Sequence, residues 1–165
     1  MRAQRGFTLV EILIVVVILG ILAAIVIPQF TQASTEAKTN SLCSDLQTLR
    51  SQIELYKVQH NDKAPALGTF HAQMTQTSDI DGNTSGNKVR QGLFVYGPYL
   101  ERVPINPFND RTDADFTNQG SVLAGTAATA GGDTASWVYN ATTGEIWADD
   151  DFDADNDGAP DHADL

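Results

Sequence analysis

Cysteine is almost absent from this chain, and its scarcity limits how the fold can be stabilised. Cys43 is the single cysteine among 165 residues, so no intramolecular disulfide can form. Packing, assembly with other chains or metal binding must therefore supply the stability. Cys43 lies one turn from Leu46 in a helical pattern, which predicts a small buried hydrophobic residue, and the alternative is a thiol that bonds a second chain.

Basic residues are also scarce, above all in the last third of the chain. No Lys or Arg follows Arg111, whereas 12 of the 21 acidic residues do, and the formal net charge is -11. This imbalance disfavours nucleic acid as a partner, because phosphate contacts need clustered cations. The same imbalance indicates that the C-terminal third of the chain binds cations.

Charge is nearly missing from residues 7–27, where Glu11 is the one ionisable side chain. As a helix these residues are roughly 31 Å long, enough to cross the hydrocarbon core of a bilayer. The apolar run is longer than the core of about 7 to 15 residues in a secretory signal peptide. Arg2 and Arg5 precede it, so the positive-inside rule predicts a cytoplasmic leader and an exported body. A carboxylate at Glu11 requires a partner in such a segment.

The junction between leader and apolar run, GFTLVE from Gly6 to Glu11, resembles the type IV pilin superfamily. The resemblance implies that a prepilin peptidase cuts between Gly6 and Phe7 and methylates the new N terminus of Phe7. It also implies that Glu11 of one subunit neutralises that amine on its neighbour when the helices pack into a filament. Removal of the leader leaves eight basic and 21 acidic residues, a formal charge of -13.

Pro28 follows the apolar run and also fits the family pattern. Because proline removes one backbone hydrogen bond and disfavours helix at the preceding residue, we expect a bend or local melting there. Residues 29–61 continue as an amphipathic helix, and the turn cluster that begins at Asn61 ends it. The apolar face of this helix consists of Phe30, Ala33, Ala37, Leu42, Leu46, Leu49, Ile53 and Tyr56. The opposite face is expected to be solvated and carries Glu36, Lys38, Asp45, Arg50, Glu54 and Lys57.

Residues 62–165 are expected to form one small globular domain. Residues 66–79 predict a short helix with Leu67, Phe70 and Met74 on one side, and residues 97–110 predict an irregular proline-rich loop that packs on the domain. Residues 136–139 and 145–148 flank a turn and predict a β-hairpin, with Trp137 and Trp147 in the core. The fold class is therefore α+β: a long N-terminal helix, transmembrane in residues 7–28, packed on a small antiparallel sheet, as in pilins.

The acidic C terminus has the spacing of a calcium loop. Residues 153–164 match positions 1, 3, 5, 6, 9 and 12 of the pattern, with Gly158 at the sharp turn. Carboxylate oxygens suit a hard cation such as Ca²⁺. The alternative is a solvated tail that repels itself. The candidate ligands are Asp153, Asp155, Asp157, Asp161 and Asp164, to which Asp149, Asp150 and Asp151 could add.

Within the superfamily the chain most resembles a type II secretion major pseudopilin, because many type IV pilins close a C-terminal disulfide that one cysteine cannot make. The resemblance implies a single-pass protein of the bacterial inner membrane that later joins a periplasmic filament. Its partners would be further copies of itself, the prepilin peptidase, minor pseudopilins and an inner-membrane assembly platform. The alternatives are a type IV pilin for adhesion, motility or DNA uptake, and a membrane-tethered calcium-dependent binding module. An enzyme is not expected, because the carboxylates lie in a metal-type loop and the histidines have no catalytic spacing.

Overall fold

The computed structural model describes residues 7–108, 122–125 and 135–149. The chain divides into two compact units, Met1–Thr39 and Asn40–Leu165. Within the described residues six elements follow one another, namely one long helix, two short helical segments and three short strands. This order agrees with the predicted α+β class.

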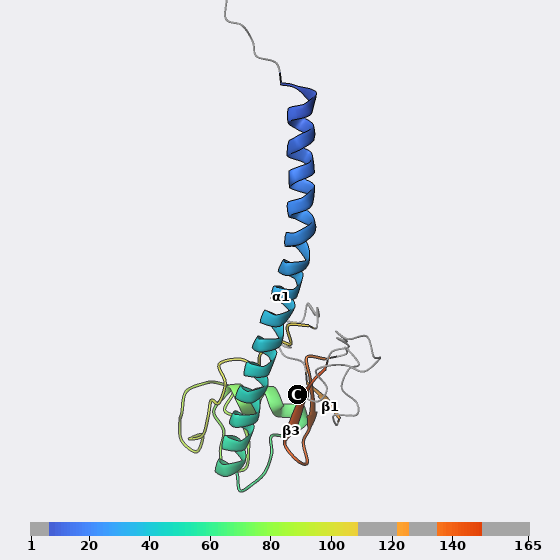
Figure 1. The fold of residues 1–165 in the computed structure, drawn as a ribbon. Coiled ribbons are helices and arrows are strands. Elements are labelled where there is room, and N and C mark those ends of the chain that lie inside the picture. Colours follow the sequence, from blue (N-terminus) through green and yellow to red (C-terminus); the bar gives the residue numbers. More distant parts are fainter. Residues whose placement is uncertain (1–6, 109–121, 126–134, 150–165) are drawn as a thin grey trace, which may run out of the picture. The chain divides into compact units, whose positions relative to one another are not determined.

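Helix α1 spans Leu9–Gln59 and is the long blue-to-green helix of Figure 1. It runs through Pro28 without interruption, so the expected local melting at this residue is wrong. The physical reason is that proline's fixed φ of about -65° is compatible with a helix, and only one hydrogen bond of a long ladder is lost. The predicted segments 7–28 and 29–61 therefore belong to one continuous element.

In the first unit, the apolar side chains of α1 are uncovered. Their exposed fractions between residues 9 and 27 range from 41% at Val26 to 82% at Leu9. No globular protein leaves such a stripe in water, so a bilayer or other chains must cover it. Among the described residues, α1 is the one helix that is long and apolar enough to cross a membrane.

In the second unit, the end of α1 supplies one side of the core. Its buried side chains recur at steps of four and three residues, which places them on one stripe of the helix. They are Leu42, Leu46, Leu49, Ile53 and Tyr56. The predicted short helix is present as a 3-10 turn, Leu67–Thr69, followed by α2, Phe70–Thr75. Phe70 and Met74 are buried in the same core, as expected.

In the part of the chain that the structure describes, the sheet has three strands in the order β1-β2-β3, namely Val122–Ala124, Trp137–Asn140 and Glu145–Ala148. Strands β2 and β3 pair in antiparallel fashion, with Trp137 opposite Ala148, which confirms the predicted hairpin. Gly144 takes a positive φ of 85° in its turn, a conformation that favours glycine. Strand β1 adds to β2 in parallel, a pairing that the sequence did not predict.

The two tryptophans differ in burial. Trp137 is fully buried and belongs to the core, as predicted. Trp147 is half-buried and lies outside this cluster, so its predicted core position is wrong. The reason is the period of two in a strand: Ile146 and Ala148 face the core, and the residue between them faces the other side of the sheet.

The proline-rich loop packs on the domain as predicted. Val103 is fully buried, and Tyr99, Leu100 and Phe108 lie against the core cluster. Trp137 Nε1 donates a hydrogen bond of 2.8 Å to the Pro104 carbonyl oxygen, so the loop is also tied to β2.

Candidate functional site

Glu11, the predicted assembly residue, takes part in a local hydrogen-bonded motif at the start of α1. The Thr8 backbone N–H and hydroxyl each donate to Glu11 Oε2 at 3.3 Å, and the Glu11 backbone N–H donates to Thr8 Oγ1 at 3.3 Å. These reciprocal bonds form a capping box, in which an N-cap threonine and a glutamate three residues later satisfy the first backbone donors of a helix. The motif T-x-x-E is visible in the sequence, yet sequence reasoning missed this role of Thr8.

The capping box gives Glu11 a stabilising role within its own chain. Its carboxylate lies in the first turn, where the partial positive charge of the helix N terminus favours an anion. The carboxylate is therefore partly stabilised by its own chain. Phe7, the predicted methylated residue, is 76% exposed. Gly6 lies outside the described residues.

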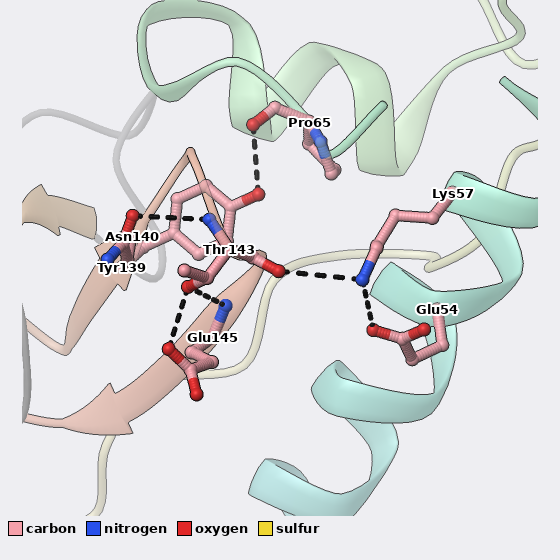
Figure 2. A network of polar contacts seen from close by, with 7 residues as sticks. All are labelled: Glu54, Lys57, Pro65, Tyr139, Asn140, Thr143 and Glu145. Atoms are coloured by element: carbon pink, nitrogen blue, oxygen red, sulfur yellow. Dashed lines mark hydrogen bonds and ion pairs between the residues drawn. The ribbon is translucent and has the colours of Figure 1, made fainter. Parts of the chain in front are cut away.

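A second cluster of polar contacts holds the β-hairpin turn next to the end of α1 (Figure 2). Lys57 Nζ lies 2.8 Å from Glu54 Oε1 and donates at 3.5 Å to the Thr143 carbonyl oxygen. The hydrogen bond to Glu54 raises the pKa of Lys57. Thr143 Oγ1 donates to Glu145 Oε2 at 2.7 Å, and Tyr139 Oη donates to the Pro65 carbonyl oxygen at 2.9 Å. The hairpin is thus fixed to the helix and to the chain that follows it.

Arg50 contributes to the same anchoring of β3. Its Nε and Nη2 donate to the Ile146 carbonyl oxygen at 3.3 Å and 3.1 Å. The expectation that Arg50 belongs to a merely solvated face is therefore wrong, because a long side chain can reach a strand that lies 96 residues away in sequence. Cys43, on the same helix, is half-buried and not fully buried as predicted.

The acidic C-terminal run begins at a buried carboxylate. Asp149 is fully buried; its Oδ2 accepts a hydrogen bond of 2.8 Å from the Ala135 N–H. The Asp149 backbone N–H donates to the Ser136 carbonyl oxygen at 3.2 Å. Asp149 therefore ties the chain before β2 to the chain after β3. The other candidate calcium ligands lie outside the described residues: Asp150, Asp151, Asp153, Asp155, Asp157, Asp161 and Asp164.

His60 is the one fully buried histidine among the described residues, and its contacts are those of a core residue. Its ring stacks on Tyr56 with centroids 3.7 Å apart. Its Nδ1 lies 2.8 Å from the Tyr56 carbonyl oxygen and its Nε2 lies 3.0 Å from Ser78 Oγ. Since a carbonyl only accepts, Nδ1 donates to the Tyr56 carbonyl oxygen. Both ring nitrogens are thereby used in packing α1 against the loop that follows α2.

Within the parts of the chain that the structure describes, no group of three His, Cys, Asp or Glu residues is arranged to hold a metal ion. The ligands proposed from the sequence thus depend on the segment that begins after Asp149.

Comparison with known proteins gives two concordant results. Residues 1–27 match the family model described as "Prokaryotic N-terminal methylation motif". The chain is similar to type II secretion system core protein G of Pectobacterium carotovorum subsp. carotovorum, with 43% identity over 117 residues, which cover 71% of this chain and 69% of the relative. The protein of the same name from Klebsiella pneumoniae is 41% identical over 108 residues, 66% of this chain and 71% of the relative.

A longer match, to type II secretion system core protein G of Escherichia coli strain K12, has 28% identity over 149 residues, 90% of this chain and 89% of the relative. No solved structure matches the chain significantly. The resemblance inferred from GFTLVE is confirmed, because the family match covers the N-terminal motif and the relatives extend it over most of the chain.

Proposed function

Because the chain belongs to the family of type II secretion system core protein G, we propose that it is a structural subunit of a pseudopilus that assists type II protein secretion, and not an enzyme. One observation carries this proposal. The first half of α1 is apolar and uncovered over residues 9–27, and it starts at a methylation motif with one acidic residue. A helix of this kind is suited to a bilayer and also to the dry centre of a bundle of identical helices.

The proposal gives this helix two successive environments. Before assembly it anchors the chain in the inner membrane, with the basic leader in the cytoplasm and the second unit in the periplasm. After the prepilin peptidase has cut between Gly6 and Phe7, the helix moves into a filament built from copies of the chain. Minor pseudopilins and an inner-membrane assembly platform are the further partners of this step.

Glu11 is the residue that distinguishes assembly from simple anchoring. In the single chain its carboxylate accepts from Thr8. In the filament it would face the methylated amine of Phe7 on a neighbouring chain, which forms an ion pair in a water-free core. Such a pair sets the register between subunits, because leaving either charge unpaired there costs several kcal/mol.

The test compares two acidic residues of α1 in cells that contain the rest of the secretion machinery. We expect Glu11→Leu to insert in the membrane at the normal level and to abolish fibres that can be sheared from the cells. Glu36→Leu is the matched control, since Glu36 is an exposed acid of the same helix, and it should retain fibres. Mass spectrometry of the mature N terminus should find methylated Phe7. Normal fibres with Glu11→Leu, or an intact Met1 in the wild-type chain, would contradict the proposal.

We further propose that the acidic C terminus binds Ca²⁺. The support is chemical: every candidate donor is a carboxylate oxygen, as a hard cation requires, and the run starts at Asp149, which is fixed between two chain segments. Asp153, Asp155, Asp157, Asp161 and Asp164 would hold the ion, with Asp149, Asp150 and Asp151 as further donors. The ion would offset the repulsion among these acids.

The calcium proposal can be tested on residues 29–165 in solution, because every core side chain lies at residue 42 or beyond. We expect a chelator to lower the melting temperature, and added Ca²⁺ to restore it. The substitutions Asp155→Asn and Asp157→Asn together should remove this calcium response, whereas Asp79→Asn, in a loop with its own hydrogen bonds, should leave it intact. An identical melting curve with and without Ca²⁺ would refute the proposal.

A further inference from the structure

A short turn with exposed apolar side chains, residues 88–95, lies on the surface of the second unit. Two backbone hydrogen bonds of 3.1 Å join Gln91 and Phe94 and close a tight turn, in which Gly92 has a positive φ of 60°. We call residues 88–95 the finger. Its apolar side chains are exposed: Val89 by 69%, Leu93 by 80% and Val95 by 49%. Apolar residues gathered on one turn are more informative than single exposed ones, because such patches mark interaction sites.

The finger also differs from the rest of the molecule in charge. Between Asp81 and Glu101 there is no acidic residue, whereas Lys88 and Arg90 both lie in the finger. Arg90 Nε donates to the Gly97 carbonyl oxygen at 3.0 Å, and Lys88 forms an ion pair with Glu101. These contacts fix the base of the finger. A basic, apolar element on a strongly acidic body is complementary to the surface of another copy of that body.

A groove lined by residues outside the finger has the matching chemistry. Its volume is about 490 Å³, within the range of pockets that admit several side-chain groups. Leu100, Pro104 and Ile105 give it an aliphatic wall, and Ile105 is 44% exposed. Asp45 of α1 and Arg102 also line the groove, where burial raises the pKa of the Asp45 carboxyl group and Arg102 opposes the rise. A further cation in this groove would stabilise the carboxylate.

We propose that the finger of one copy docks into this groove of the next copy in the fibre, with Leu93 against the aliphatic wall and Arg90 facing Asp45. The inference rests on the proposed function, since it names the contact between bodies of the same filament. Finger and groove are different surfaces, so the contact is heterologous, and a heterologous contact that does not close generates an open helical filament. It also counteracts the repulsion between chains that each carry a formal charge of -13 after processing.

The test uses disulfide cross-linking in the full-length chain, expressed with the complete secretion machinery. All variants carry Cys43→Ser, so that only introduced thiols can react. The test variant combines Leu93→Cys with Ile105→Cys, and each substitution is also made alone. The matched control pairs Ile105→Cys with Val58→Cys, because Val58 is apolar and 81% exposed but lies outside the finger.

A heterologous contact predicts a ladder of dimers, trimers and larger species for the Leu93/Ile105 pair on a non-reducing gel. The single variants and the control pair should give no ladder, and Glu11→Leu should abolish it. Fibres that form without a ladder, a ladder of equal strength in the control pair, or dimers alone would overturn the docking proposal and leave the pseudopilus function standing. Wild-type chains that form no fibres would instead refute the proposed function itself.

Discussion

Tyr139→Phe gives a sharp test of how the hairpin is held in the second unit. The tyrosine is fully buried, and its hydroxyl donates to the carbonyl oxygen of Pro65, a buried residue, at 2.9 Å. Phenylalanine keeps the ring and its contact with Phe70, whose centroid lies 4.7 Å away. The substitution therefore removes one donor and leaves one carbonyl unpaired in the core.

The expected loss follows from this geometry. A buried acceptor left without its donor costs about 1 to 3 kcal/mol, so we take about 2 kcal/mol. For a domain of this size, each kcal/mol lowers the melting temperature by roughly 4 °C, which gives a decrease of about 8 °C. The free energy of unfolding should fall while the denaturant m-value stays the same, since no surface is newly exposed.

The assay is thermal and urea unfolding of residues 29–165, followed by tryptophan fluorescence. Tyr99→Phe is the matched control, because Tyr99 Oη donates at 2.7 Å to the Gln59 side chain, which is only half-buried and can turn to water. That variant should lose less than about 1 kcal/mol. An equal decrease in the two variants, or none with Tyr139→Phe, would show that the bond to Pro65 does not hold the hairpin.

Three further predictions concern other parts of the chain. Gly82→Ala should lower the free energy of unfolding by about 2 kcal/mol or more, because Gly82 has a φ of +86° and an added Cβ would lie 2.6 Å from Tyr56 Oη. Gly86→Ala is the control: Gly86 has a φ of +80° but open space around it, so the loss should be about 1 kcal/mol. Burial raises the pKa of Tyr56 to about 12, above its unfolded value near 10, so the contribution of Tyr56 to stability should be fully present below pH 10 and fall by about 2 kcal/mol by pH 12. An alkaline titration followed by tyrosinate absorbance and circular dichroism measures this loss. Thr8→Ala should weaken the capping box by about 1 kcal/mol, so hydrogen exchange of the backbone amides in the first turn of α1 should become about fivefold faster in detergent. Unchanged exchange would contradict the capping role of Thr8.

The sequence alone was enough to predict the elements whose buried residues recur at regular intervals. The stripe from Leu42 to Tyr56 and the aromatic strands of the hairpin were found because burial on one side of a helix or strand leaves a regular pattern. The resemblance to the family was recognised from GFTLVE, a contiguous motif at the start of the apolar run. These features are local, so they need no knowledge of the fold.

The remaining features depend on residues that are distant in sequence. The pairing of β1 with β2 is parallel, and a three-residue strand without alternation gives no sign of its partner. Arg50 reaches Ile146 across 96 residues, which no periodicity can reveal. Trp147 was misplaced because residue type was given more weight than strand alternation. At Pro28, the local tendency of proline to interrupt a helix was outweighed by the regular helix on both sides of it.

The contact of Arg50 with Ile146 also sets the order of events during biosynthesis. Residues near the start and the end of the second unit share one core, so this core cannot be completed until the chain as far as residue 148 is available. Contacts that are so distant in sequence also slow folding, because the intervening loop must be ordered first. In the proposed topology, the newly exported chain would wait unfolded at the membrane surface while its N-terminal helix tethers it there, and periplasmic chaperones and proteases would meet it in that interval.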